Sequence, residues 1–103
     1  MSKWVRVAGT ADVPPGQGRE VMADDQVVAL FRVGDNQYYA LDGICPHAGG
    51  PLGEGELHGA IVTCPWHGWQ FDVSTGTHCL NRNLTHRSYP VKVEGDDVLI
   101  ELP

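Results

Sequence analysis

Two short boxes in this chain each place a cysteine close to a histidine: Cys45-Pro-His47 and Cys64-Pro-Trp-His67. Residues 48–63 separate the two boxes. Thiolates bind iron and zinc strongly, and a neutral imidazole is an acceptable ligand for both metals. A zinc finger usually takes two cysteines from one element and two histidines from another, whereas here each predicted loop offers one sulfur and one nitrogen donor.

This division of donors suits a binuclear site in which one iron takes both thiolates and the other iron takes both imidazoles. A single zinc ion held by all four side chains is the alternative, and an iron assay together with visible colour would separate the two. A disulfide between Cys45 and Cys64 would leave the histidines without a function. In a cytosolic chain such a pattern more often indicates a metal site.

Length and composition restrict the possible classes of protein. The chain has 103 residues, 42% apolar and 19% charged, which predicts one globular domain spanning 1–103. No apolar run approaches the roughly 18 residues that cross a bilayer, and the first residues do not form a signal peptide, so we expect a cytoplasmic protein. The net charge of −6 argues against nucleic acid as a partner and favours attraction to a basic patch on another protein.

Signals for strands are frequent along the chain, and signals for helices are almost absent. Short β-rich runs are bounded by turn residues, and two pairs of runs read as hairpins. The predicted strands cover residues 4–7, 27–33, 37–41, 60–63, 69–73, 89–93 and 98–102. Short strands at close spacing predict an all-β fold, either an antiparallel sandwich or a small barrel. The segment 42–69 is rich in glycine and proline, and it is interpreted as an insertion that carries the metal site.

The two boxes resemble those of the Rieske [2Fe–2S] family, and in particular its low-potential soluble ferredoxins. The likeness extends to the flanking stretches YYALDGICPH, GGPLGEGEL, FDVSTG and YPVKVEGDDVLIEL, so it covers nearly the whole chain. It implies a Rieske-like antiparallel β-sandwich with an inserted, loop-rich cluster-binding subdomain at about 42–72, and one [2Fe–2S] cluster. The four implied ligands are Cys45 and Cys64 on one iron and His47 and His67 on the other.

The resemblance also predicts a low reduction potential. High-potential respiratory members carry an extra cysteine on each ligand loop, and Gly50 and Trp66 occupy the matching positions here. Those members also have a serine and a tyrosine whose hydroxyls bond to sulfur, and Trp69 and Phe71 stand in their place. Fewer donors stabilise the reduced cluster less, which predicts a potential near about −150 mV rather than about +300 mV.

The remaining histidines and cysteine lack a ligand spacing. We expect His58, His78 and His86 at the surface, and Cys79 as a small, partly buried side chain. Many family members cover the cluster with a proline-rich loop before the penultimate strand. Residues 80–84 occupy that place here and contain no proline.

The resemblance points to a soluble one-electron carrier rather than an enzyme. Its implied partners are a flavin-dependent NAD(P)H reductase, which supplies electrons, and the terminal oxygenase of an aromatic-ring-hydroxylating system, which receives them. One alternative is the small subunit of an assimilatory NAD(P)H nitrite reductase, which shares the fold and both boxes. Another is a structural zinc module that only binds a partner. Neither a membrane nor a nucleic acid is an expected partner.

Overall fold

The structure is a computed structural model that describes residues 3–43, 51–66, 68–79 and 86–102. The described chain contains ten strands and two short 3-10 turns, and none of its helical segments is long or apolar enough to cross a membrane. All strand pairings among the described residues are antiparallel, which confirms the predicted all-β, antiparallel fold.

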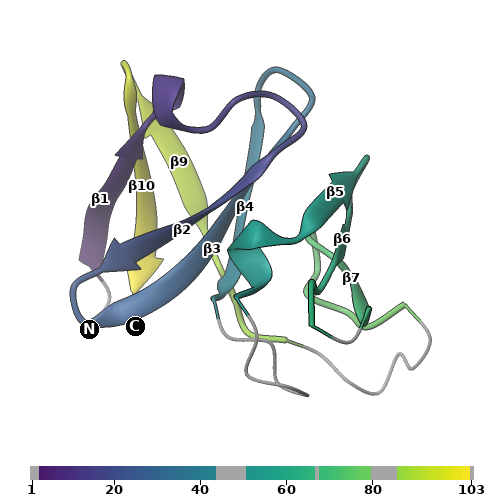
Figure 1. Cartoon of the computed structure of the whole chain (residues 1–103). Helices are drawn as coiled ribbons and strands as arrows, with labels where there is room; N and C mark the ends of the chain where they lie inside the picture. The colour runs from purple at the N-terminus through teal and green to yellow at the C-terminus, as the bar shows by residue number, and fades with distance from the viewer. Residues whose placement is uncertain (1–2, 44–50, 67, 80–85, 103) are drawn as a thin grey trace.

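Two of the three sheets face each other as a sandwich (Figure 1). The first has the strand order β1 (Lys3–Gly9), β10 (Asp97–Leu102) and β9 (Val91–Glu94). The second has the order β2 (Gly18–Ala23), β3 (Gln26–Val33), β4 (Gln37–Asp42) and β8 (Ser88–Tyr89). Pairing of β1 with β10 brings the two ends of the chain side by side, with Lys3 opposite Leu102.

The third sheet is small and lies to one side of the sandwich (Figure 1). It consists of β5 (Glu56–His58), β6 (Ile61–Thr63) and β7 (Gln70–Asp72), in that order. The 3-10 turn η2 (Leu52–Glu54) leads into β5, and the other 3-10 turn, η1 (Thr10–Asp12), follows β1. The first ligand box lies between β4 and η2 in the sequence, and the second lies between β6 and β7.

Strand β3 is buried on both faces, and this explains its long apolar run. Val28 and Leu30 belong to the core between the two large sheets, which we call the sandwich core. Ala29 and Phe31 belong to a second apolar cluster, which also includes residues of the small sheet and is called the site core here. Because successive side chains of a strand point to opposite faces, a strand between two cores must be apolar throughout.

The site core fastens the small sheet to the sandwich. Its buried members come from β3, β4, η2, β6 and β7 and from the residues next to them. They are Ala29, Phe31, Leu41, Leu52, Val62, Cys64, Phe71 and Val73. One of the four predicted metal ligands, Cys64, is therefore part of the packing that holds the two units of the fold together.

Candidate metal centre

Cys64 lies immediately after β6, at the start of the second box. Its side chain is almost fully buried and forms no disulfide. Its backbone N–H donates to the carbonyl of Trp69 over 2.7 Å, and its own carbonyl accepts from the N–H of Gly68 over 3.0 Å. These bonds close a tight loop between β6 and β7, so the position of the Cys64 sulfur is fixed by the sheet beneath it. His67, the other predicted ligand in the second box, lies outside the described residues.

Cys45 and His47 of the first box also lie outside the described residues, but the two ends of their segment are described. Gly43, which follows β4, accepts a hydrogen bond from the N–H of Leu52 over 3.0 Å. The N–H of Gly43 in turn donates to the carbonyl of Val27 on β3 over 3.0 Å. The points where the chain leaves β4 and enters η2 are therefore joined to each other and to the sandwich.

The bases of the two ligand loops meet in the site core, because Leu52, which follows the segment containing the first box, and Cys64, which begins the second box, are both buried there. Gly55 allows this close approach. A Cβ atom at Gly55 would overlap the carbonyl oxygen of Thr63 on β6, so any side chain at this position would push the segment after η2 away from the small sheet.

The described residues fit a [2Fe–2S] cluster in donor chemistry and in surroundings. Cys64 supplies a sulfur donor that is not engaged in a disulfide, at an apolar position shielded from water. Two closed loop bases that share one core can hold donors on opposite sides of a binuclear centre. Within the described ranges no group of three His, Cys, Asp or Glu side chains could hold a metal ion.

The prediction that three histidines lie at the surface is right for one and wrong for two. His58 is exposed and pairs with Glu56 over 3.0 Å. His78 and His86 are only 5% and 7% exposed. Both rings pack against Phe71, with centroid distances of 5.2 Å for His78 and 5.5 Å for His86, and aromatic packing of this kind offsets the burial of an imidazole.

Cys79 is exposed, which corrects the expectation that it is partly buried. The residue follows His78, whose ring is buried against Trp69 with centroids 4.6 Å apart. The N–H of Cys79 donates to the carbonyl of Gln70, so the chain is extended beside β7. Neighbouring side chains of an extended segment point in opposite directions, and burial of His78 therefore turns Cys79 outward.

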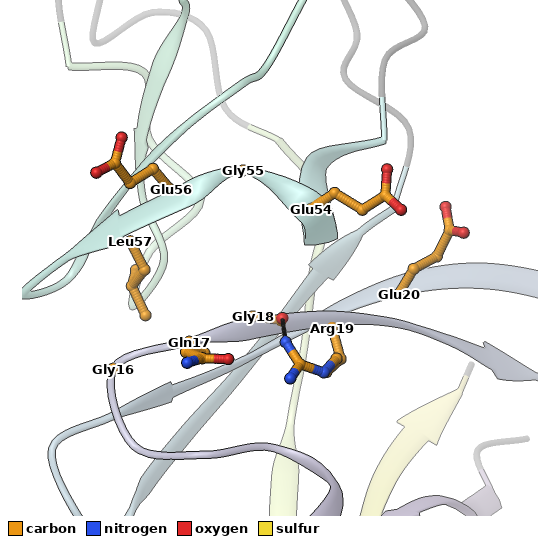
Figure 2. Close-up of a pocket in the computed structure, with 9 residues that line it drawn as sticks. All are labelled: Gly16, Gln17, Gly18, Arg19, Glu20, Glu54, Gly55, Glu56 and Leu57. Carbon is orange, nitrogen blue, oxygen red and sulfur yellow. Dashed lines mark hydrogen bonds between the residues drawn. The ribbon is translucent and has the colours of Figure 1, made fainter.

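A cavity of about 610 Å³ lies along the seam between β2 and β5 (Figure 2). Figure 2 shows Glu20 and Glu54 at one end and Glu56 at the other. The guanidinium of Arg19 donates to the carbonyl of Gly18 over 2.9 Å. Carboxylates are hard donors that suit magnesium or calcium rather than iron–sulfur chemistry, and Cys64, the predicted ligand that the structure describes, does not line this cavity.

The family assignment follows from the sequence and this fold together. The model of the Rieske [2Fe–2S] domain matches residues 3–90. The chain belongs to the Rieske [2Fe–2S] domain family. Rieske domains carry a [2Fe–2S] cluster, so the prediction of a cluster of this kind is supported, and the prediction of the family is confirmed.

Curated relatives of this Rieske protein are electron-transfer components of dioxygenase systems. The ferredoxin component of a naphthalene 1,2-dioxygenase system from Pseudomonas aeruginosa is 34% identical over 101 residues, which cover 97% of this chain and 96% of the relative. A 3-phenylpropionate/cinnamic acid dioxygenase ferredoxin subunit from Shigella boydii is 40% identical over 95 residues, covering 90% of this chain and 88% of the relative. These relatives agree with the prediction of an electron-transfer component rather than an enzyme.

Solved structures give the same result. The ferredoxin of carbazole 1,9a-dioxygenase from Nocardioides aromaticivorans has a TM-score of 0.86 and 35% identity, over 95% of this chain and 96% of its own. A chain in a complex of oxygenase and ferredoxin of carbazole 1,9a-dioxygenase has a TM-score of 0.84 and 33% identity, over 94% and 91%. A putative nitrite reductase small subunit from Mycobacterium tuberculosis reaches a TM-score of 0.90 over 100% and 97%, but at 23% identity this likeness shows the fold alone.

Proposed function

We propose that this protein carries single electrons from a flavin-dependent NAD(P)H reductase to the terminal oxygenase of an aromatic-ring-hydroxylating system. The observation that carries the proposal is the near end-to-end match to ferredoxin components of dioxygenase systems. A ferredoxin of this kind has been solved in complex with an oxygenase, which supports the oxygenase as the electron acceptor. The reductase draws on NAD(P)H, a cytoplasmic coenzyme, and we therefore infer that the carrier works in the cytoplasm.

One [2Fe–2S] cluster per chain is part of the proposal, with Cys45 and Cys64 on one iron and His47 and His67 on the other. When bound, the cluster supplies a one-electron redox couple. The whole chain, 1–103, would form one Rieske domain, with the cluster-binding subdomain at about 42–72. In support, the described part of that segment folds as a separate small sheet, and its apolar residues share one core with β3 and β4.

The described residues contribute rigidity and shielding to this function. Hydrogen bonds at Gly43 and Cys64 close both loop bases, which holds the described ends of the two ligand loops in place. Leu52 and Phe71 are fully buried beside Cys64 and keep water away from the sulfur-binding end. Small structural reorganisation is what a carrier needs for repeated one-electron exchange.

The charge of the protein favours transient partners. A net charge of −6 attracts basic patches, and contacts of less than about 1,200 Å² are typical of electron-transfer encounters. The rate of complex formation should therefore fall as salt rises. The nitrite reductase alternative has the weaker support, because its structural neighbour cited above is a likeness in fold alone.

The function can be tested in two steps. First, the dithionite-reduced protein should give an EPR spectrum whose average g is lower than that of an all-cysteine cluster, with about two irons per chain. Second, the reduced protein should be reoxidised when mixed with the oxidised terminal oxygenase of an aromatic-ring-hydroxylating system. Reoxidation by a sirohaem nitrite reductase instead would favour the alternative subunit, and a colourless protein loaded with zinc would exclude both electron-transfer functions.

The reduction potential should lie at the low end of the family range, near about −150 mV. Phe71 and Trp69 stand where a hydroxyl donor would act, and Phe71 is fully buried with its ring against His78 and His86. Neither side chain supplies a hydroxyl to lower the charge on sulfur in the reduced state. A spectroelectrochemical titration checks this expectation, and a midpoint well above 0 mV would contradict it.

A further inference from the structure

His86 is a buried polar residue that contacts the end of β4 and a residue of β7. Its Nε2 atom lies 2.8 Å from the carbonyl oxygen of Asp42, at the end of β4. A carbonyl oxygen can only accept a hydrogen bond, so Nε2 must carry the hydrogen and donate it. The side chain is 7% exposed, and water therefore competes little for this bond.

The bond from His86 acts on the base of the first ligand loop. Asp42 and Gly43 directly precede the segment that contains the first box. The N–H of Asp42 donates to the carbonyl of Arg87 over 2.8 Å, so residues 86 and 87 hold both the N–H and the C=O of Asp42. The end of β4, which precedes the first box, is thus held by one backbone hydrogen bond to Arg87 and by one side-chain hydrogen bond from His86.

The same imidazole also contacts the base of the second ligand loop. Its ring lies 5.5 Å from the ring of Phe71, centroid to centroid, at an interplanar angle of 37°. Phe71 on β7 pairs with Val62 on β6, two residues before Cys64. It also contacts Trp69, whose carbonyl accepts the N–H of Cys64. His86 therefore touches one residue from each loop base.

We propose that His86 is a positioning residue that sets the relative placement of the two ligand loops, through its hydrogen bond to Asp42 and its ring contact with Phe71. The inference rests on the proposed function, because it assumes that both loops hold one cluster. It assigns a task to a histidine outside both boxes. If the loop bases move relative to each other, the donors attached to them move as well, and the cluster is held less firmly.

The test compares His86→Gln with His86→Met. The two side chains have nearly the same length and shape, but only glutamine can donate to the Asp42 carbonyl. His58→Gln is the matched surface control, because His58 is exposed and its described partner is Glu56. Three quantities are measured for each variant: the rate of iron release from the dithionite-reduced protein into a ferrous chelator, the EPR spectrum of the reduced protein and the midpoint potential.

We expect His86→Met to release iron about five to ten times faster than His86→Gln, as the loss of one hydrogen bond predicts. The EPR lines of His86→Met should also broaden or shift, whereas those of His58→Gln should match the parent protein. Equal rates of iron release from His86→Gln and His86→Met would overturn the role given to the hydrogen bond, and parent-like rates in both variants would overturn the proposal as a whole. Absence of a [2Fe–2S] signal from the parent protein would instead overturn the proposed function.

Discussion

Replacing Cys64 with serine is expected to abolish the visible absorption and the EPR signal of the protein. Cys64 is the predicted ligand that the structure describes, and its side chain is 1% exposed at the base of the second box. A serine hydroxyl ionises far less readily than a thiol and is a harder donor, so it binds an iron–sulfur cluster poorly. Iron analysis of the purified variant should give less than about a tenth of the parent content, since loss of a ligand from a closed loop leaves one iron incompletely coordinated.

Two further variants separate a ligand from a packing residue. Cys79→Ser changes the other described cysteine, which is exposed, and it should leave the iron content, the colour and the EPR spectrum unchanged. Cys64→Ala keeps a small apolar side chain in the site core, so it preserves the packing while removing the sulfur. Normal cluster content in Cys64→Ala would show that Cys64 is only a core residue, and the proposed ligand set would then be wrong.

The strands that the sequence predicts well are those with strong apolar runs next to clear turns. The residues 27–33 and 37–41 were predicted as a hairpin, and β3 and β4 form one with Val33 opposite Gln37. The run at 98–102 likewise forms β10. In these segments burial, strand propensity and turn residues all favour the same structure, and such agreement makes a local prediction reliable.

Two strands of the structure, β2 and β5, are not predicted from the sequence, and each has a physical reason. β2 carries the exposed side chains Arg19, Glu20 and Met22, and it lies at the edge of its sheet. An edge strand buries less and needs fewer apolar residues, so its signal is weak. β5 has only three residues, and its structure depends on pairing with β6, which is a tertiary contact.

The sequence predicts the ligand boxes, but it does not predict the residues that support the bases of their loops. Ligand chemistry requires particular side chains at short spacing, and this leaves a local mark in the sequence. His86 meets Asp42 across 44 positions of the chain, and its ring meets Phe71 only after the sheets have packed. A single histidine with no second ligand-type residue at a short spacing leaves no such pattern in the sequence. This explains why the prediction that His86 lies at the surface was wrong.

Gly76→Ala is expected to destabilise the protein strongly, because two separate costs coincide at this position. Gly76 has a φ of +79°, a left-handed conformation that costs another residue about 1–2 kcal/mol. A Cβ atom there would also overlap the carbonyl oxygen of His86, whose N–H donates to the carbonyl of Gly76 over 2.6 Å. Relief of the overlap requires backbone movement, which adds about 1–3 kcal/mol by comparison with overpacked cores.

Gly59→Ala is the matched control that isolates the overlap. Gly59 also has a positive φ, +60°, but a Cβ atom at that position would meet nothing within 4 Å. In thermal unfolding followed by circular dichroism, Gly59→Ala should be destabilised only by the left-handed backbone conformation, and its Tm should fall by roughly 5–15 °C. Gly76→Ala should lower Tm by at least about twice as much. It should also release iron faster, since the displaced segment carries His86. Equal Tm values for the two variants would mean that residues 76 and 86 are not packed as the structure describes.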